Sequence, residues 1–447
     1  MDKLRIKCIE ALNSIFRGDL KPKDALSINN VYETSRDRSF VMEIVYGVIR
    51  YRDYLDWLLG IFIRAIDELS DETLNNLRIA LYQIIFMRVP DRASVFEAVE
   101  IEKTNKGKPS LVNAVLREYI RRRDNIKTSS IKDPVKRLAV ETSHPYWLTK
   151  SWIERFGYKE ARELAMKNNE KPPLTLRFTD TKDVKMAIDA LTVDNIAHRL
   201  SQYCPNSVIV EDTVTYDYLS KAIGERFFIQ DEASQLITYL LNPEPFMTVL
   251  DACSAPGGKT IHIAEMMQDK GQIIAVDVSE SRIRQLKSNI KDSGYSSIKV
   301  INTDILRLHH IEWIKPNYFD RILLDAPCSS IGVIRRNPDV KYRHKLVDLK
   351  RFKKKQLEML EYLFNFLKPG GQMVYSVCST ERQEGEEVIK AFLQKKSNLC
   401  KIYSSFSKVI DFSIFYNTEE KDFVSYRTFP HRHNIDGFFS ALIKKVS

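Results

Sequence analysis

The sequence is poor in cysteine and contains no long apolar run. Its 447 residues include six cysteines, which are too few and too scattered to stabilise the chain by disulfide bonds, and none forms a C-x-x-C pair. No stretch approaches the ~20 apolar residues that a membrane helix needs. Charged residues also interrupt the start of the chain, where a signal peptide would be apolar. We therefore expect a soluble, cytoplasmic chain with free thiols, no metal site and no membrane partner.

Two common nucleotide-binding loops are also missing. The dinucleotide pattern G-x-G-x-x-G does not occur, and Cys253 stands where a phosphate loop needs its first glycine. A dehydrogenase or an ATP site is therefore disfavoured. What the chain has in excess is positive charge, since 69 Lys and Arg against 59 Asp and Glu give +10 and a pI near 9.0. This balance suits a polyanionic partner such as a nucleic acid.

Three regions with different periodicity predict a multidomain α and α/β fold. Residues 1–128 carry apolar residues at three- and four-residue spacing, which predicts an all-α domain. Residues 129–235 begin as helices, and a strand at 174–178 followed by a helix at 184–191 predicts a small α+β module. From 236 to 447, strands alternate with helices, which is typical of a Rossmann-like, doubly wound parallel sheet. The expected strands are 248–251, 272–277, 298–302, 321–325 and 372–376.

A turn of small residues follows the first of these strands. The sequence over 251–260 is D-A-C-S-A-P-G-G-K-T, and such a turn lets backbone N–H groups approach a ligand closely. Asp277 ends the second strand, where a carboxylate can accept hydrogen bonds from both ribose hydroxyls, and Asp304 follows the third. For each acid alone a helix cap is the simpler interpretation. Acids at successive strand ends together indicate an adenosine pocket without a pyrophosphate.

Cysteines follow the next two strands. Cys328 comes three residues after Asp325 in D-A-P-C, and Cys378 lies in Y-S-V-C-S-T. Because the carboxyl ends of central strands face the ligand crevice of an open α/β sheet, we expect the two thiols to converge. Buried cysteines acting as small hydrophobes are the alternative. Their position just beyond strand ends favours a thiolate nucleophile with a second thiol.

These motifs resemble those of the RNA 5-methylcytosine methyltransferases. The helical region at the N-terminus resembles NusB, and the whole chain is similar to the bacterial members of the family that act on 16S rRNA. Two departures concern loop geometry and remove no reacting group: Ser330-Ile331 stands where Gly-Thr is usual, and Val377 where Thr is common. The matching segments are 224–235, 251–260, 325–329, 375–380 and 436–439.

The resemblance implies S-adenosylmethionine-dependent methylation of C5 of a specific cytosine in 16S rRNA. The substrate would be free rRNA or an assembling small subunit, and the enzyme a monomer. Cys378 would be the nucleophile that adds to C6, and Cys328 would assist product release. Asp325 would hold either the cytosine edge or the methionine end of the cofactor. The implied cofactor-binding residues are Cys253, Ser254, Ala255, Pro256, Gly257, Gly258, Lys259, Asp277, Asp304 and Asp325.

Basic runs are candidate RNA contacts. Arg335 and Arg336 follow the Cys328 loop directly, and a second run covers residues 350–355. For the second run a solvated helix face is an equally simple interpretation. Phosphate contacts position a nucleic acid without reading its sequence. The helical and α+β regions are therefore expected to supply the selectivity for one rRNA site.

Other functions remain open at this stage. A DNA cytosine-C5 methyltransferase uses the cysteine after the fourth strand as its nucleophile and lacks the second one, so Cys378 favours RNA. A different RNA is a further possible substrate. A non-catalytic NusB-like RNA-binding factor would not need the acids and thiols that this chain keeps.

Overall fold

The computed structural model describes residues 3–28, 34–224, 227–405 and 407–446. Glu225 and Arg226 of the 224–235 segment lie outside the described residues. The chain forms two compact units, Met1–Glu170 with Ile334–Leu346, and Lys171–Val333 with Val347–Ser447. Within the described ranges, no helix combines the length and apolar content needed to cross a bilayer.

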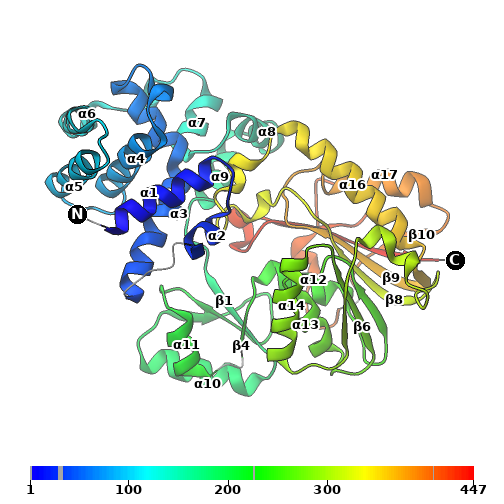
Figure 1. Ribbon diagram of the computed structural model, residues 1–447. Helices are drawn as coiled ribbons and strands as arrows, with labels where there is room; N and C mark the ends of the chain where they lie inside the picture. Colours follow the sequence, from blue (N-terminus) through cyan, green and yellow to red (C-terminus); the bar gives the residue numbers. More distant parts are fainter. Residues whose placement is uncertain (1–2, 29–33, 225–226, 406, 447) are drawn as a thin grey trace. The chain divides into compact units, whose positions relative to one another are not determined.

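The first unit is built from amphipathic helices, as the periodicity predicts. The apolar faces of α1 to α6 share one core that includes Leu12, Val45 and Leu77. Several starts are capped: Thr34 and Asp37 form a capping box before α3, and such caps satisfy backbone N–H groups that have no partner inside the helix. The helices are α1 (Lys3–Phe16), α2 (Pro22–Ile28), α3 (Ser35–Phe62), α4 (Asp71–Ile85), α5 (Asp91–Thr104), α6 (Pro109–Arg122), α7 (Pro134–Thr142), α8 (Tyr146–Phe156) and α9 (Tyr158–Lys167) (Figure 1).

A short segment from the C-terminal half completes this unit. Ile334–Leu346 contains α15 (Val340–Arg343), and the side chain of Lys341 in α15 is buried. Its Nζ donates to the carbonyl oxygens of Arg50 and Ser143, both at 2.8 Å, and to Asn169 Oδ1 at 3.2 Å. Burial lowers the pKa of Lys341 well below its usual value. In sequence these residues lie between strands of the second unit, yet they pack in the first.

The second unit begins with a small antiparallel sheet. The strand at 174–178 and the helix around 184–191 are present as expected. Arg177 in this sheet is buried, donates to Gln230 Oε1 at 2.8 Å and forms an ion pair with Glu265, which joins the module to the rest of its unit. The strand order is β2-β3-β1-β4, with β1 (Leu174–Phe178), β2 (His198–Leu200), β3 (Ser207–Val210) and β4 (Phe227–Ile229), next to α10 (Thr181–Val193) and α11 (Tyr216–Ile223).

The larger sheet of this unit contains all five strands expected from the sequence. Its order is β10-β12-β9-β8-β5-β6-β7, and strands β5 to β9 pair in parallel. The Rossmann-like, doubly wound fold is therefore confirmed. At one edge the sheet also contains antiparallel strands, since β12 runs antiparallel to β9 and β10 antiparallel to β12. The strands are β5 (Thr248–Asp251), β6 (Gln272–Asp277), β7 (Ile298–Asn302), β8 (Phe319–Asp325), β9 (Leu367–Val377), β10 (Cys400–Tyr403), β11 (Tyr426–Thr428) and β12 (Phe438–Lys445).

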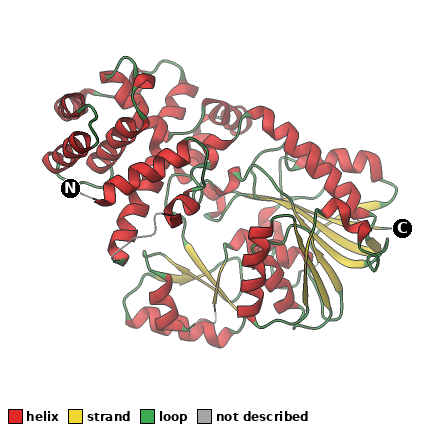
Figure 2. Ribbon diagram, in the orientation of Figure 1, coloured by secondary structure: helices red, strands yellow, loops and turns green. Residues whose placement is uncertain are grey.

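Helices cover both faces of this sheet (Figure 2). Alternate strand residues point to opposite faces, so Val249 shares a core with α12 and α13, whereas Leu250 shares one with α16 and α17. The helices are α12 (Glu232–Leu241), α13 (Gly258–Met266), α14 (Glu280–Ser293), α16 (Leu346–Phe364) and α17 (Glu386–Lys396). The carboxyl ends of β5, β6, β8 and β9 are the part of this sheet where the fold class predicts a ligand site.

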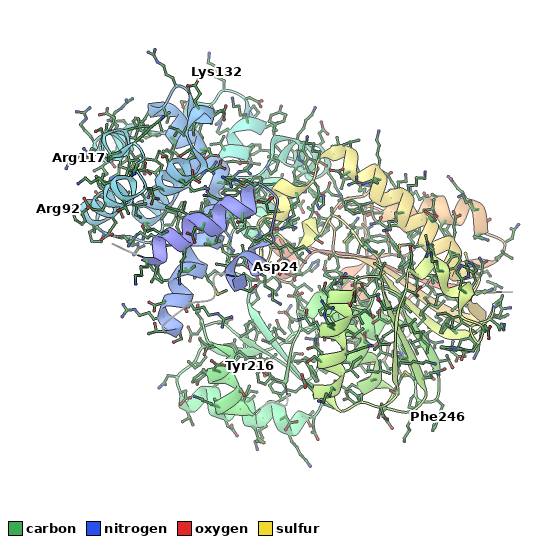
Figure 3. The ribbon with its side chains drawn as sticks, in the orientation of Figure 1. Asp24, Arg92, Arg117, Lys132, Tyr216 and Phe246 are labelled. Carbon is green, nitrogen blue, oxygen red and sulfur yellow. The ribbon has the colours of Figure 1, made fainter. Side chains whose placement is uncertain are left out.

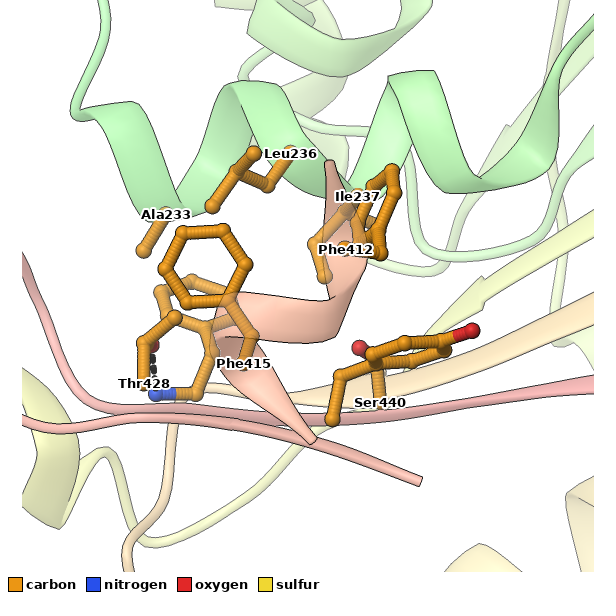
Figure 4. A pocket seen from close by; sticks show the side chains of 9 residues that line it. Ala233, Leu236, Ile237, Phe412, Phe415, Thr428 and Ser440 are labelled. Atoms are coloured by element: carbon orange, nitrogen blue, oxygen red, sulfur yellow. Dashed lines mark hydrogen bonds between the residues drawn. The ribbon is translucent and has the colours of Figure 1, made fainter. Parts of the chain in front are cut away.

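A small apolar cavity lies between α12 and the strands beneath it (Figure 4). Leu236 and Ile237 of α12 face Phe412 and Phe415, which belong to the short 3-10 helix η6 (Phe412–Phe415). The cavity measures about 10 Å³, which is no more than the space of a single water molecule. It belongs to the packing of the core and is too small for a ligand.

Candidate active site

The turn after β5 consists of small residues, and most of it is buried. Gly257 has φ of 110°, and a Cβ there would come within 2.6 Å of Leu286 Cδ1. At Gly258, where α13 begins, the nearest atom to an added Cβ would be Gln230 Nε2 at 3.9 Å. Ser254 fixes the turn, since its N–H and its hydroxyl both donate to the Val276 carbonyl, at 2.9 and 3.1 Å. These hydrogen bonds tie the turn to the end of β6, and Gly258 leaves space beside its own backbone.

Two of the expected acids lie at neighbouring strand ends. Asp277 is 4% exposed and accepts from the N–H of Ala255 at 3.2 Å and of Ser279 at 2.9 Å, so it ties the turn to the end of β6. Asp304 is exposed and caps the 3-10 helix η4 (Ile305–His310), accepting from the N–H of Leu306 at 3.1 Å. The helix cap that was the simpler interpretation is therefore present at Asp304.

A half-buried ion pair joins the start of α13 to the end of β8. Lys259 Nζ is 2.7 Å from Asp325 Oδ2, and Ser376 donates to Asp325 Oδ1 at 2.8 Å. Burial opposes the charge on Lys259, but the Asp325 carboxylate outweighs it and raises the pKa of the lysine, which keeps it an ammonium group. Nearby, burial raises the pKa of Asp251 to about 7 against the opposing hydrogen bond from Thr260.

The two cysteines lie together beyond β8 and β9. Cys328 Sγ and Cys378 Sγ are 3.3 Å apart, and both residues are half-buried. Cys378 also donates to Ser330 Oγ at 3.5 Å. The hydrogen bond with Cys378, followed by burial, raises the pKa of Cys328 well above its usual value. The Cys328 thiol is therefore held in its protonated form in this arrangement.

Gly332 ties the loop after Cys328 both to the loop after β9 and to Gly437, the residue before β12. Gly332 donates its N–H to the Cys378 carbonyl at 3.0 Å, and Gly437 donates to the Gly332 carbonyl at 2.8 Å. A Cβ on Gly332 would lie 1.8 Å from the Gly437 carbonyl oxygen. The close backbone approach that keeps both cysteine loops together therefore excludes any side chain at residue 332.

The structure does not bring Arg335 to the surface. Its side chain is 1% exposed, and its carbonyl oxygen accepts a hydrogen bond from Arg50 Nη2 at 3.1 Å. Arg335 therefore does not lie at the surface, where the sequence pattern predicted a phosphate contact, because its segment belongs to the helical unit from residue 334 onward. Arg336 is half-buried.

In the second basic run, two cations have acidic partners. Lys353 pairs with Glu387 at 2.7 Å, and Arg351 pairs with Asp348 at 3.1 Å. Exposed basic side chains also occur on the helical unit, where Arg92, Arg117 and Lys132 point outward (Figure 3). These side chains lie at the surface, unlike that of Arg335.

The sequence interpretation missed Glu384. This residue lies six positions after Cys378 in the acidic stretch E-R-Q-E-G-E-E, where a solvated surface acid is the natural reading. In the structure its side chain is completely buried and accepts hydrogen bonds from Ser329 and Ser379. Each serine directly follows one of the two cysteines, and this adjacency is the only sequence signal that pointed to the contact.

Comparison with known proteins identifies each part of the chain. The family model for the 16S rRNA methyltransferase RsmB/F matches residues 238–444, and the NusB family matches residues 3–121. A ferredoxin-like domain of RsmF/B-like methyltransferases matches residues 144–217. Similar solved structures include that of PH0851, with a TM-score of 0.80 and 25% identity over 100% of this chain and 99% of that one. A methyltransferase homologue from Pyrococcus horikoshii has the same fold over 70% of this chain and 100% of its own, with a TM-score of 0.58 and 24% identity.

Two relatives match along most of their length. A Bacillus subtilis protein described as probable ribosomal RNA small subunit methyltransferase B is 35% identical over 426 residues, covering 92% of this chain and 91% of that protein. Ribosomal RNA small subunit methyltransferase B of Pseudomonas putida is 32% identical over 396 residues, covering 88% and 89%. Fold and site thus define a Rossmann-like methyltransferase with a NusB domain. The chain belongs to the 16S rRNA methyltransferase RsmB/F family, which confirms the resemblance seen in its motifs.

Proposed function

We propose that this chain methylates C5 of a specific cytosine in 16S rRNA with S-adenosylmethionine, through a covalent bond between Cys378 and C6 of the base. The observation that carries the proposal is the pair of thiols, 3.3 Å apart at the ends of two adjacent strands. The small-residue turn after β5 belongs to the same sheet edge. The names of the relatives support small-subunit rRNA as the substrate class.

The residues around the β5 turn fit S-adenosylmethionine. Gly258 leaves open space next to the backbone, and Asp277 offers carboxylate oxygens for ribose hydroxyls. Val278 follows Asp277 and is 69% exposed, so it provides an apolar surface for a planar base. When bound, S-adenosylmethionine supplies an electrophilic methyl group. Lys259 at the start of α13 pairs with Asp325 at the end of β8, where Asp325 can hold the methionine end or the cytosine edge.

Covalent addition solves the central difficulty of the reaction. C5 of cytosine is a weak nucleophile, but attack of the Cys378 thiolate on C6 moves the electron pair of the C5–C6 double bond onto C5. C5 can then form its bond to the methyl group. Removal of the C5 proton restores the double bond and expels Cys378 as a thiolate. One difficult step is thereby divided into easier ones.

The thiol pair also gives Cys328 a timed role. In the free enzyme, the hydrogen bond with Cys378 is the largest cause of the raised pKa of Cys328. Once Cys378 is a thioether attached to C6, this effect disappears and Cys328 loses its proton more readily. Cys328 then acts as the base that takes the C5 proton, at the stage where a base is needed.

Mapping the methylated nucleotide tests the proposal. Purified chain would be incubated with isotopically labelled S-adenosylmethionine and either 16S rRNA or assembling small subunits, with 23S rRNA as the control substrate. We expect label only in 16S rRNA, at one cytosine that then resists bisulfite conversion. Label on a ribose, on an exocyclic nitrogen or on 23S rRNA would contradict the proposed chemistry.

Asp277→Ala should weaken S-adenosylmethionine binding by at least about tenfold. A hydrogen bond to a charged group contributes roughly 1.5–3 kcal/mol, and each 1.4 kcal/mol corresponds to about tenfold in affinity. Calorimetry would measure the dissociation constant, with the folded state checked by circular dichroism. Glu280→Ala is the matched control, because Glu280 is exposed and pairs with Arg284 on the surface. Equal affinity of the wild type and Asp277→Ala would contradict the assignment.

A further inference from the structure

A buried carboxylate connects the two cysteine loops. Glu384 is 0% exposed and lies in the turn between β9 and α17. One of its carboxylate oxygens, Oε2, accepts from the hydroxyls of Ser329 at 2.5 Å and Ser379 at 2.6 Å. The other, Oε1, accepts from the backbone N–H of Ser329 at 2.8 Å. A single side chain therefore holds the residue that follows each cysteine.

Surrounding residues fix Glu384 in turn. Gln356 of α16 donates to Glu384 Oε1 at 3.2 Å and to the Pro327 carbonyl at 3.0 Å, which makes a second link to the loop of Cys328. Tyr375 of β9 donates to the Glu384 carbonyl at 2.5 Å. Arg427 is buried and donates to the Ser379 carbonyl at 2.7 Å. The carboxylate is thus attached to a rigid part of the core.

Hydrogen bonding offsets the cost of burying this acid. Burial raises the pKa of Glu384, and the donors from Ser329, Ser379 and Gln356 act in the opposite direction. Removing the carboxylate would leave two serine hydroxyls and a backbone N–H buried without this acceptor. A buried polar group without a partner is costly, so the loops would shift to find other partners.

We propose that Glu384 is a positioning residue that sets the separation of the Cys328 and Cys378 thiols, a role that rests on the proposed function for its catalytic meaning. The carboxylate acts through Ser329 and Ser379, since its hydrogen bonds run to these serines rather than to either sulfur. Loss of the bridge lets the cysteine loops separate. A displacement of about 1 Å at reacting groups costs on the order of a hundredfold in rate.

A dithiol probe measures thiol separation directly. Phenylarsine oxide forms two As–S bonds to a pair of close thiols and releases its oxygen as water, taking up both thiol protons. We expect wild-type chain to form this bridged adduct and Cys328→Ala to lose it. Glu384→Ala should bind the probe at least about tenfold more weakly than the wild type. Glu384→Gln should remain within about threefold, because its amide oxygen can accept from the Ser329 N–H while the hydroxyls rotate to accept from its NH₂.

Further variants separate positioning from general stability. Ser379→Ala removes one hydrogen bond to Glu384 and should weaken probe binding by less than Glu384→Ala does. This variant keeps the proposal testable if Glu384→Ala does not fold. Glu387→Gln is the matched control, since Glu387 is half-buried, pairs with Lys353 and should leave probe binding unchanged. Thermal unfolding of each variant would report its folded fraction. Unchanged probe binding in folded Glu384→Ala or Ser379→Ala, or no bridged adduct in the wild type, would overturn the proposal.

Enzyme kinetics supply the second readout. Glu384→Ala should lower kcat by about a hundredfold and leave the affinity for S-adenosylmethionine unchanged, because Asp277 and Gly257 belong to other strand ends. If Glu384→Ala lost S-adenosylmethionine affinity by as large a factor as it lost kcat, Glu384 would have a merely structural role and the proposal would be overturned. A wild-type chain that forms the arsenical adduct but does not methylate rRNA would refute the proposed function alone.

Discussion

Cys378→Ala should abolish both rRNA methylation and covalent capture of RNA. Without the thiolate that adds to C6, C5 never becomes nucleophilic, and the rate should fall by at least about 10⁴-fold, as for other enzymes that lose their nucleophile. Cys328→Ala should instead form the C6 adduct and transfer the methyl group, and then fail to release the product. A protein–RNA species should accumulate and survive a denaturing gel.

The order of the steps makes this gel decisive. Addition must precede methyl transfer, and elimination can only follow it, so the two variants stop at opposite ends of the reaction. Both should keep their affinity for S-adenosylmethionine, since neither thiol holds the adenosine. Cys253→Ala would show whether the third half-buried cysteine contributes to capture. Loss of the adduct in Cys328→Ala with retention in Cys378→Ala would reverse the assigned roles, as in the DNA enzymes.

Gly332→Ala should have a large effect on both stability and activity. An added Cβ would lie 1.8 Å from the Gly437 carbonyl oxygen and 3.0 Å from the Cys378 carbonyl oxygen. Both obstacles are backbone atoms, which cannot move aside as a flexible side chain can. Overpacking of this kind costs about 1–3 kcal/mol or more in unfolding free energy. Methylation should fall by about a hundredfold as the cysteine loops separate.

Gly60→Ala is the matched control for this change. Gly60 lies in helix α3, and an added Cβ would meet nothing within 4 Å. Alanine favours a helix over glycine by roughly 0.5–1 kcal/mol, so thermal stability should stay the same or rise slightly. Denaturant unfolding and the methylation assay would be run on both variants. A Gly332→Ala chain with wild-type stability and activity would contradict the close backbone approach.

Local sequence patterns predicted most of the elements that carry the site. The strands that end at Asp251, Asp277 and Asp325 were expected at their observed C-terminal residues, because the aliphatic runs are short and helical stretches separate them. Strand β12 was not expected, although its first residues were recognised as a family motif. Its antiparallel place beside β9 depends on long-range pairing, which periodicity alone does not specify.

The parts of the site that were missed depend on tertiary contacts. The sequence around Glu384 is typical of a surface acid. In the structure, however, Glu384 accepts a hydrogen bond from Ser329, which is 55 residues away in sequence. Arg335 looks like a phosphate contact until its segment packs into the helical unit. In both cases the charge pattern is typical of a solvated surface, and only the path of the chain reverses the interpretation.

The path of Ile334–Leu346 also bears on how such a protein can be divided or assembled in evolution. The chain passes between its two units after residues 170, 333 and 346, so no single cut separates them. An isolated methyltransferase fragment would carry Lys341 without its acceptors, and an isolated N-terminal fragment would leave the Arg50 and Ser143 carbonyls without that lysine. The helical unit is therefore not a separate N-terminal domain, because it includes residues from the C-terminal half of the chain. Recombination at a single boundary would separate Ile334–Leu346 from the rest of the helical unit. This arrangement favours inheritance of the two units together.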